Sequence, residues 1–128
     1  MVAHSSEGLD ELSIAASSKV AELRGGEVSE YEIVPEELGL ERHDLSQLMV
    51  EDVEQSLVMV REALSDADSP AGQMVALNAG AAIYVSGVAD SHKQGVEMAI
   101  DAISIGLAKN KLSELADFTA QLKELEGS

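Results

Sequence analysis

A β-hairpin is predicted by the stretch Lys19-Val-Ala-Glu-Leu-Arg-Gly-Gly-Glu-Val-Ser-Glu-Tyr-Glu-Ile-Val34. Two strand-like runs flank Gly25-Gly26, and a two-residue turn of this kind needs the positive φ that glycine adopts without strain. In the register set by this turn, two pairs of opposite charge and one aromatic–aliphatic pair face each other. These pairs are Arg24 with Glu27, Lys19 with Glu32, and Val20 with Tyr31. The hairpin therefore predicts a sheet in the N-terminal part of the chain.

A further strand and two adjacent carboxylates precede the hairpin. Met1-Val2-Ala3-His4 is typical of the end of a strand, and a polar turn over Ser5–Gly8 separates it from Asp10 and Glu11. Neighbouring side chains on a strand point to opposite faces, but on an irregular loop they can converge on one cation. Mg²⁺ usually takes one or two protein carboxylates and leaves its other positions to water and phosphates. Chance alone gives so acidic a chain several adjacent acidic pairs, so the pair by itself does not identify a metal site.

The residues after the hairpin predict a short turn and then a helix. Pro35 fits the first position of a helical turn over Glu36-Glu37-Leu38, which Gly39 ends. Residues 40–50 are predicted to be a connection, and Asp52 is predicted to cap the helix that follows it. The apolar face of that helix consists of Val53, Leu57, Val60 and Leu64.

A buried helix is predicted over about residues 71–86. Ser69 caps it, Pro70 takes its first position and Gly87 ends it. Small or apolar side chains lie nearly all round this helix, which is typical of a helix covered on every side. Gly80 in its interior lowers helix stability by about 1 kcal/mol relative to alanine. Because this cost is tolerated, we expect the glycine to permit the close approach of a neighbouring element.

Two polar side chains of this helix have alternative interpretations. Asn78 is either a ligand contact or, as the residues favour, a core amide bonded to a neighbouring loop, because buried polar groups are usually satisfied internally. Tyr84 is predicted to belong to the core rather than to a site.

Two further helices are predicted in the last part of the chain. Asp90 or Ser91 caps the first, Gly106 interrupts it, and the second runs from about Lys109 to Leu125. The first is expected to turn Val96, Ala99, Ile100, Ile103 and Leu107 inward. The second has an apolar side consisting of Leu112, Leu115, Phe118 and Leu122.

Charge and composition exclude several classes of partner. The formal net charge is −16, with eight basic residues against 24 acidic ones, so the surface repels DNA, RNA and anionic membranes. The chain has no cysteine, hence neither a disulfide framework nor a thiolate metal site. No apolar run reaches the roughly 20 residues needed to span a bilayer. A soluble cytoplasmic protein is therefore expected, without nucleic-acid or membrane partners.

Other constellations of catalytic or ligand residues are weak. His4, His43 and His92 lie far apart and lack partners at metal-ligand spacing, so a zinc site is not expected. No Gly-x-Ser-x-Gly nucleophile elbow occurs, and no Gly-x-x-x-x-Gly-Lys-Ser/Thr phosphate loop.

Four stretches together resemble the C-terminal part of anthranilate phosphoribosyltransferase. They are His4-Ser-Ser-Glu-Gly-Leu-Asp-Glu-Leu-Ser13, Lys19-Val-Ala-Glu-Leu-Arg24, Ala76-Leu-Asn-Ala-Gly-Ala-Ala-Ile-Tyr-Val-Ser-Gly87 and Gly95-Val-Glu-Met-Ala-Ile-Asp-Ala-Ile103. The resemblance covers nearly all of this chain and only the last part of such an enzyme.

The resemblance implies a fold, an activity and a metal site. The family transfers phosphoribosyl from phosphoribosyl pyrophosphate to anthranilate in tryptophan biosynthesis, and its α/β domain is similar to that of pyrimidine nucleoside phosphorylases. Its Asp-Glu pair helps to hold magnesium on the pyrophosphate, which implies that Asp10 and Glu11 are Mg²⁺ ligands here. Residues 1–128 are thereby expected to be the C-terminal part of one α/β domain. Residues 1–34 would form a strand, the metal loop and the hairpin, and residues 52–125 about four helices.

The family's glycine-rich phosphate loop and its anthranilate loop have no counterpart in this sequence. In the family they lie upstream, so we expect a C-terminal fragment that is inactive alone and self-associates or pairs with the missing upstream part. Its opening strand is expected inside a mostly parallel sheet completed by that part. Two alternatives remain open: a fragment of a related nucleoside phosphorylase, and a non-catalytic acidic interaction module.

Overall fold

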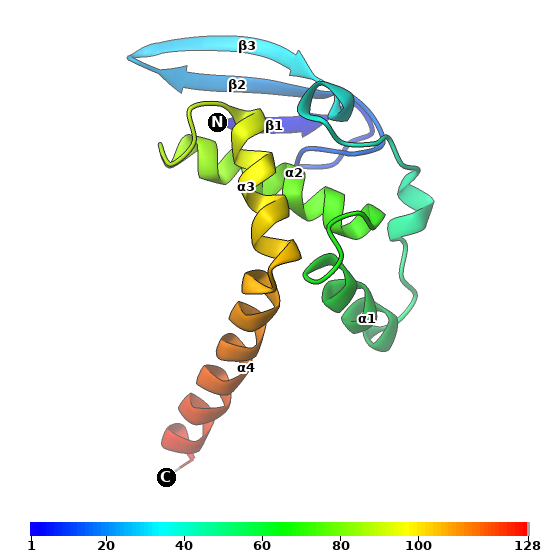
Figure 1. Cartoon of the computed structure of the whole chain (residues 1–128), viewed down its shortest axis with the longest axis vertical. Coiled ribbons are helices and arrows are strands. Elements are labelled where there is room, and N and C mark those ends of the chain that lie inside the picture. The colour runs from blue at the N-terminus through cyan, green and yellow to red at the C-terminus, as the bar shows by residue number, and fades with distance from the viewer. Residues whose placement is uncertain (128) are drawn as a thin grey trace.

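The computed structural model describes residues 1–127, and a sheet covers one side of its helices (Figure 1). The described residues form strands β1 (Val2–Ser5), β2 (Ser18–Arg24) and β3 (Glu27–Ile33), the 3₁₀-helices η1 (Pro35–Leu38) and η2 (Leu45–Leu48), and helices α1 (Val53–Ala63), α2 (Pro70–Val85), α3 (His92–Ser104) and α4 (Leu107–Glu126). This mixed α/β arrangement confirms the predicted fold class, with its strand, hairpin and helical part. None of these described helices is long and apolar enough to cross a membrane.

The hairpin has the predicted register. Strands β2 and β3 pair antiparallel, with Arg24 opposite Glu27, Lys19 opposite Glu32, and Val20 opposite Tyr31. Gly25 and Gly26 have φ values of 61° and 86°, which are those of a primed two-residue turn. The two glycines therefore fix the side of the sheet on which each hairpin side chain lies.

Strand β1 extends the hairpin into a sheet of order β1-β2-β3. It pairs antiparallel with β2, with Ala3 opposite Val20 and Ser5 opposite Ser18. Strand β2 is thus the antiparallel neighbour of β1 on one side, and the parallel strands expected from the upstream part remain a prediction.

The helix starts follow the predicted capping residues. The Asp52 carboxylate accepts from the Gln55 N–H at 2.7 Å, and the Ser69 hydroxyl accepts from the Gly72 N–H at 3.0 Å. For α3, the sequence left Asp90 and Ser91 open, and Ser91 is the cap. Pro35 begins η1 and Gly39, with φ 83°, ends it, as predicted.

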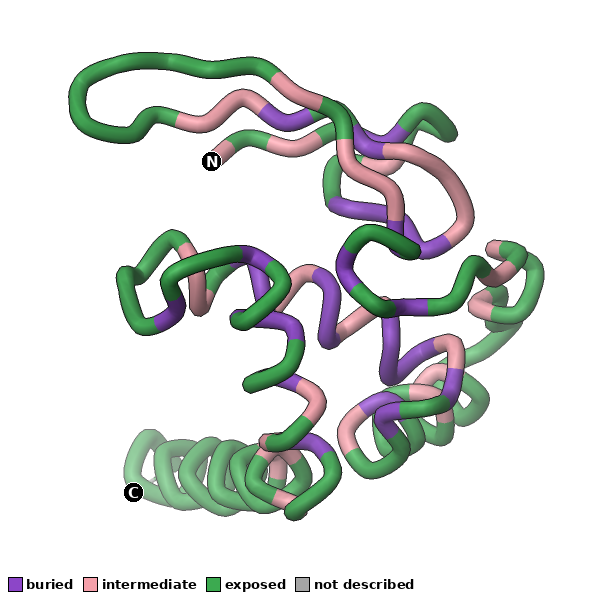
Figure 2. Tube along the Cα trace, turned by 45° about the horizontal axis from the view of Figure 1, so that its top comes forward, coloured by how far each residue is buried: buried purple, intermediate pink, exposed green. Residues whose placement is uncertain are grey.

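One hydrophobic core joins the sheet to the helices. Leu12 and Val20 from the N-terminal part are packed in the same cluster as Leu77, Ala81 and Val96 from α2 and α3. The buried residues accordingly gather where the sheet loops meet α2 and α3, whereas the hairpin tip and α4 are exposed (Figure 2). This face of α2 is therefore covered within the chain, by α3 and the loop before β2.

Helices α2 and α3 cross at two glycines, Gly80 and Gly95. A Cβ added to Gly80 would lie 2.5 Å from the Val96 nitrogen, and one added to Gly95 would lie 2.2 Å from the Gly80 carbonyl oxygen. The predicted role of Gly80 in close packing is confirmed, since no larger side chain fits between these backbones.

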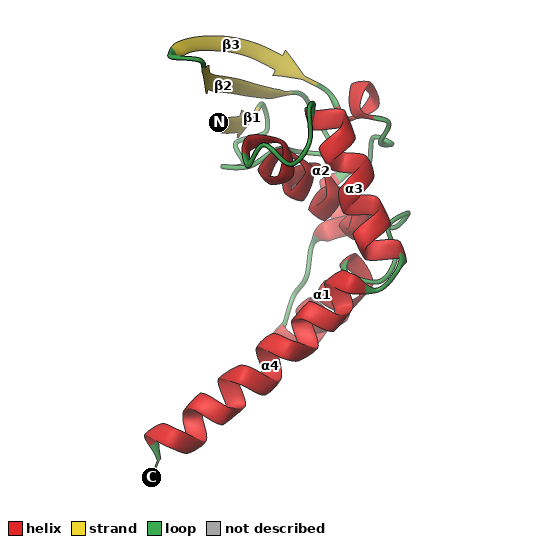
Figure 3. Cartoon of the chain, turned by 60° about the vertical axis from the view of Figure 1, so that its left-hand side comes forward, coloured by secondary structure: helices red, strands yellow, loops and turns green. Residues whose placement is uncertain are grey.

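The two apolar helix faces predicted on α1 and α4 are largely exposed, and so is one residue predicted to face inward. On α1, Val53 is 84% exposed, and on α4, Phe118 is 58% exposed. Leu107, predicted to face inward from the preceding helix, is 56% exposed, because Gly106 redirects the chain and Leu107 begins α4. Helix α4 consequently projects away from the rest of the described chain (Figure 3). A 3.6-residue period identifies one face of a helix but not what covers that face.

Candidate metal-binding site

Asp10 and Glu11 lie in the loop that connects β1 to β2. Both side chains are exposed. Within residues 1–127, neither carboxylate has a hydrogen-bond or ion-pair partner. Their oxygens are therefore available to a ligand that approaches from solvent.

The loop is fixed just before the two carboxylates by Ser5, the last residue of β1. The Ser5 hydroxyl accepts from the Leu9 N–H at 3.0 Å, and the Ser5 N–H donates to the Leu9 carbonyl oxygen at 3.0 Å. Ser5 is fully buried, so water does not compete for these bonds. From the sequence alone, Ser5 is predicted only to lie in a polar turn. The signal that was available is the tendency of serine to bond to nearby backbone groups at turns.

The loop is fixed again just after the carboxylates by Asn78 of α2. The Leu12 N–H donates to Asn78 Oδ1 at 3.0 Å, and Asn78 Nδ2 donates to the Leu12 carbonyl oxygen at 2.9 Å and to the Met74 carbonyl oxygen at 3.1 Å. Of the two interpretations of Asn78, the amide bonded to a neighbouring loop is confirmed.

A second polar cluster holds the loop as it returns to β2. The Ser13 hydroxyl donates to Glu7 Oε2 at 2.6 Å, and the Ser13 N–H donates to the Ser18 hydroxyl at 3.1 Å. Ser13 and Ser18 are both buried. The Glu7 carboxylate therefore accepts a hydrogen bond from within the loop. Among the described residues, Asp10 and Glu11 are the loop carboxylates without such a bond.

A cavity of about 310 Å³ lies beside the two carboxylates. Asp10 and Glu11 line it together with Asn78, and apolar side chains of the first 12 residues and of α2 form the rest of its wall. The apolar residues are Met1, Ala3, Leu12, Ala81, Ala82 and Val85. The fold therefore brings both predicted ligands to one hollow of the surface.

The donor set fits a hard divalent cation that is only partly coordinated by protein. In residues 1–127 no group of three or more potential metal-binding side chains converges, so a closed protein cage is not formed. Mg²⁺ does not require one, because it commonly binds through one or two carboxylates and fills its remaining positions with water and phosphate oxygens. Asp10 and Glu11 meet that smaller requirement.

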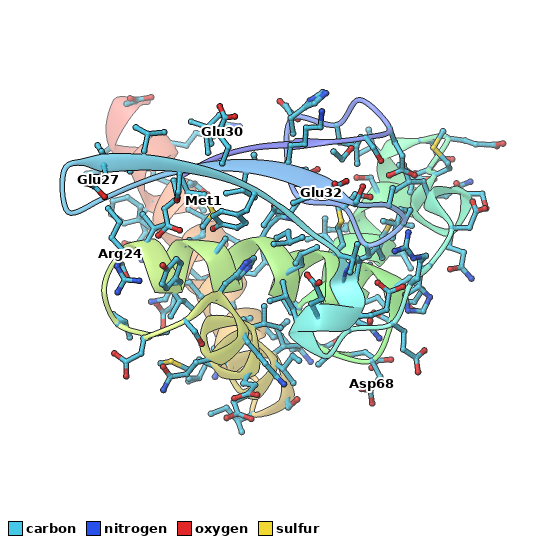
Figure 4. The ribbon with its side chains drawn as sticks, turned by 90° about the horizontal axis from the view of Figure 1, so that it is seen from above. Met1, Arg24, Glu27, Glu30, Glu32 and Asp68 are labelled. Carbon is cyan, nitrogen blue, oxygen red and sulfur yellow. The ribbon has the colours of Figure 1, made fainter. Side chains whose placement is uncertain are left out.

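A separate polar network ties the hairpin to α2. The Tyr84 hydroxyl donates to Glu22 Oε1 at 2.6 Å and accepts from Arg24 Nη1 at 3.0 Å, and the Tyr31 hydroxyl donates to Glu22 Oε2 at 3.0 Å. The Arg24 guanidinium also lies 5.7 Å from the centre of the Tyr84 ring. Figure 4 shows Arg24 beside one end of α2. Tyr84 is only partly buried, so the prediction that it belongs to the core is wrong.

Hydrogen bonding in this network shifts the acid–base behaviour of its members. The hydrogen bond from Tyr84 is the main cause that lowers the pKa of Glu22, and the bond from Tyr31 adds to it. Burial, together with the bond to Glu22, raises the pKa of Tyr31 to about 12. At neutral pH the network thus contains one carboxylate, one guanidinium and two neutral phenols.

Comparison with known proteins gives one consistent result. Residues 1–109 match the model of a family described as the glycosyl transferase family, a/b domain. Anthranilate phosphoribosyltransferase of Thioalkalivibrio sulfidiphilus is 53% identical over 120 residues, which are 94% of this chain and 36% of that enzyme. The same enzyme of Stutzerimonas stutzeri is 49% identical over 128 residues, 97% of this chain and 37% of the enzyme. The chain spans about 36% of the length of the curated relatives that it matches, in their C-terminal part, as the resemblance predicted.

Solved structures agree on the fold. Anthranilate phosphoribosyltransferase from Thermus thermophilus superimposes with a TM-score of 0.78 at 33% identity, over 91% of this chain and 34% of that one. The enzyme from Saccharomyces cerevisiae in complex with PRPP and Mg has a TM-score of 0.77 at 22% identity, over 93% and 34% of the two chains, and supports the fold alone. With the family model covering most of its residues, the chain belongs to the glycosyl transferase family, whose α/β domain it matches.

Proposed function

We propose that this chain takes part in the anthranilate phosphoribosyltransferase reaction. In this reaction phosphoribosyl passes from phosphoribosyl pyrophosphate (PRPP) to anthranilate and pyrophosphate is released, which is a step of tryptophan biosynthesis. The observation that carries the proposal is the 53% identity to an enzyme of that name over 94% of this chain. The yeast enzyme of the same fold, solved with PRPP and Mg, indicates the kind of ligand to expect.

Within this reaction we assign Asp10 and Glu11 to Mg²⁺. When bound, Mg²⁺ supplies positive charge that offsets the negative charge gathering on the leaving pyrophosphate. The two carboxylates are exposed, without partners among residues 1–127, and line one cavity, so they can accept a cation that arrives with its phosphate ligand. The apolar wall of that cavity shields one side from water, which strengthens the attraction between carboxylate and cation.

Most phosphate contacts are proposed to come from residues that this chain does not supply. A net charge of −16 repels a polyphosphate. The chain spans only about 36% of its relatives' length, and the remaining part of such an enzyme is the expected source of phosphate-binding and anthranilate-binding groups.

The test is a double substitution, Asp10→Asn with Glu11→Gln, in the full-length enzyme. We expect activity to fall by about two orders of magnitude or more, because the substitutions remove the negative charge that holds the metal while keeping side-chain size. The melting temperature should hardly change, since both side chains are exposed and have no hydrogen-bond or ion-pair partner among residues 1–127. A magnesium titration of the rate is the measurement.

Glu36→Gln with Glu37→Gln provides the control for that test. These are also adjacent exposed acidic residues, but they lie on η1, where Glu36 pairs with Arg42, away from the residues that line the cavity. The control should keep its rate and its magnesium dependence. An unchanged rate and magnesium dependence in the Asp10 and Glu11 variant would overturn the assignment.

A further inference from the structure

We propose that Asn78 is a positioning residue for the metal loop. Its amide fixes the main chain of Leu12 and thereby fixes the direction in which Asp10 and Glu11 present their carboxylates. The inference rests on the proposed function, because it assumes that a divalent cation binds at Asp10 and Glu11.

The two carboxylates form a two-residue span anchored at both ends. Before the span, Ser5 and the Leu9 main chain exchange two hydrogen bonds, each of 3.0 Å. After the span, Asn78 exchanges two with the Leu12 main chain, at 3.0 and 2.9 Å. The first anchor is local to the loop, whereas the second is the hydrogen-bonded link from the span to α2.

The chemistry of the amide suits this role better than metal ligation. Asn78 donates one N–H to the Leu12 carbonyl oxygen and the other to the Met74 carbonyl oxygen one turn earlier in α2, while its own oxygen accepts from the Leu12 N–H. Both donors and the acceptor are thus engaged. The bond to Met74 holds the amide in one orientation on the helix, so the helix dictates where the Leu12 main chain lies.

The orientation of the Asp10–Glu11 backbone and the attachment of the loop to the core depend on different contacts. The Leu12 side chain is 1% exposed and belongs to the main core, so it keeps the loop attached to α2 when the amide is lost. The amide bonds then chiefly set the direction of the backbone that carries Glu11. Ligand groups need positions held to within about 0.5 Å, and loss of such outer contacts typically weakens metal binding about 10- to 100-fold.

The test uses Asn78→Leu, of similar size, and Asn78→Gln, which keeps the amide but moves it one methylene further. Mn²⁺, followed by electron paramagnetic resonance, is the binding probe in the full-length enzyme. We expect both variants to bind Mn²⁺ about tenfold more weakly. The Mg²⁺ concentration for half-maximal rate should rise by a similar factor, and the KM for anthranilate should stay unchanged.

Gln73→Leu provides a matched control on the same helix. Gln73 is buried, accepts from the Glu41 N–H at 2.8 Å and donates to the Asp68 carbonyl oxygen at 3.3 Å, so it also joins α2 to loops. Those loops do not carry Asp10 or Glu11. This variant should lose thermal stability as Asn78→Leu does but keep its Mn²⁺ affinity.

The outcomes distinguish this inference from the proposed function. If Asp10→Asn with Glu11→Gln weakens Mn²⁺ binding but both Asn78 variants retain wild-type affinity, the positioning role is wrong and the metal site stands. Equal weakening by Gln73→Leu and Asn78→Leu would show a general structural effect and would also overturn it. If Asp10→Asn with Glu11→Gln binds Mn²⁺ with wild-type affinity, both the proposed metal site and the proposed role of Asn78 are wrong. Asn78→Gln supplies the answer if Asn78→Leu fails to fold.

Discussion

At the scale of single residues, the absence of a side chain sets the distance between α2 and α3. A Cβ on Gly80 would lie 2.5 Å from the Val96 nitrogen and 2.6 Å from Val96 Cγ2. One of these atoms is backbone and the other is the side chain of a fully buried residue, so neither can move alone. Gly80 therefore fixes how closely Val96 approaches α2 in the core that Leu12 also joins.

Gly80→Ala is expected to destabilise the protein although alanine favours helix. Helix propensity would contribute about 1 kcal/mol in favour of alanine. Overpacking between two backbones costs about 1–3 kcal/mol or more, and a contact of 2.5 Å lies at the severe end. A net loss of about 1–2 kcal/mol in the free energy of unfolding should appear in urea denaturation.

Ala82→Gly serves as the control for this prediction. Ala82 is exposed on the same helix, so this change measures the alanine–glycine difference without a neighbouring helix. It should cost about 1 kcal/mol. A Gly80→Ala variant more stable than the wild type would contradict the close-packing argument.

At the scale of elements, hydrogen bonds and charge determine how the sheet sits on the helices and which of its edges is open. The Glu22 carboxylate joins β2 to α2 through Tyr84 and to β3 through Tyr31. Glu27, Glu30 and Glu32 are spread along β3 (Figure 4), and three like charges on one strand oppose pairing with another strand. The outer edge of β1 has no comparable charges, and Val2 there is 72% exposed. An additional strand is therefore more readily accepted at β1.

Tyr84→Phe should raise the pKa of Glu22, because the Tyr84 hydroxyl is the main cause that lowers it. A carboxylate with a lowered pKa stabilises the folded state at pH values above its unfolded pKa, and this contribution is lost as the pH falls through the folded pKa. The variant should therefore lose stability at pH 7, by on the order of 1 kcal/mol, and approach the wild type in acid. Carboxyl NMR titration and urea denaturation at several pH values measure both effects.

Tyr31→Phe provides the comparison for the effect of Tyr84→Phe on the pKa of Glu22. Its hydroxyl also donates to Glu22 but lowers the pKa of that carboxyl less than Tyr84 does. The rise in the Glu22 pKa should therefore be smaller in Tyr31→Phe. A Glu22 pKa that is the same in Tyr84→Phe and in the wild type would count against the network as described.

At the scale of the whole molecule, a well-packed centre carries apolar surface that nothing in residues 1–127 covers. The core at the junction of sheet, α2 and α3 is closed, with Leu12, Leu77 and Val96 each at most 2% exposed. On α4, five large apolar side chains remain 44–74% exposed: Leu107, Leu115, Phe118, Leu122 and Leu125. Helix α1 exposes Val53 and Val58 in the same way. Exposed apolar faces of this kind favour association with another surface.

We therefore predict that the 128-residue chain alone self-associates, although its net charge of −16 opposes this. It should not turn over anthranilate by itself, and an added complementary part of the enzyme should restore some activity. Sedimentation across a concentration series, with and without that part, is the measurement. Phe118→Ser with Leu122→Gln should reduce the association without lowering the melting temperature, because both residues are exposed.

A compact monomer at every concentration, with a cooperative melt, would contradict this prediction. That result would favour an independently folding acidic module, the alternative that the sequence left open. Turnover of anthranilate by the purified chain would equally contradict the need for a complementary part.

Local chemistry determined much of what the sequence could predict. The Gly25-Gly26 turn fixed the hairpin register, and Asp52, Ser69 and Pro70 fixed helix starts, because turns and caps depend on residues close together in the chain. The resemblance to a family, also a property of the sequence, singled out Asp10 and Glu11 as candidate Mg²⁺ ligands.

The tertiary structure alone decided which faces meet. It paired β1 antiparallel with β2, left the stripes of α1 and α4 exposed, and took Tyr84 out of the core into a bond with Glu22. It also made Asn78 the partner of Leu12, 66 positions away in the sequence. A hydrophobic period or a single amide carries no information about its distant partner, because that partner is set by the packing of the whole chain.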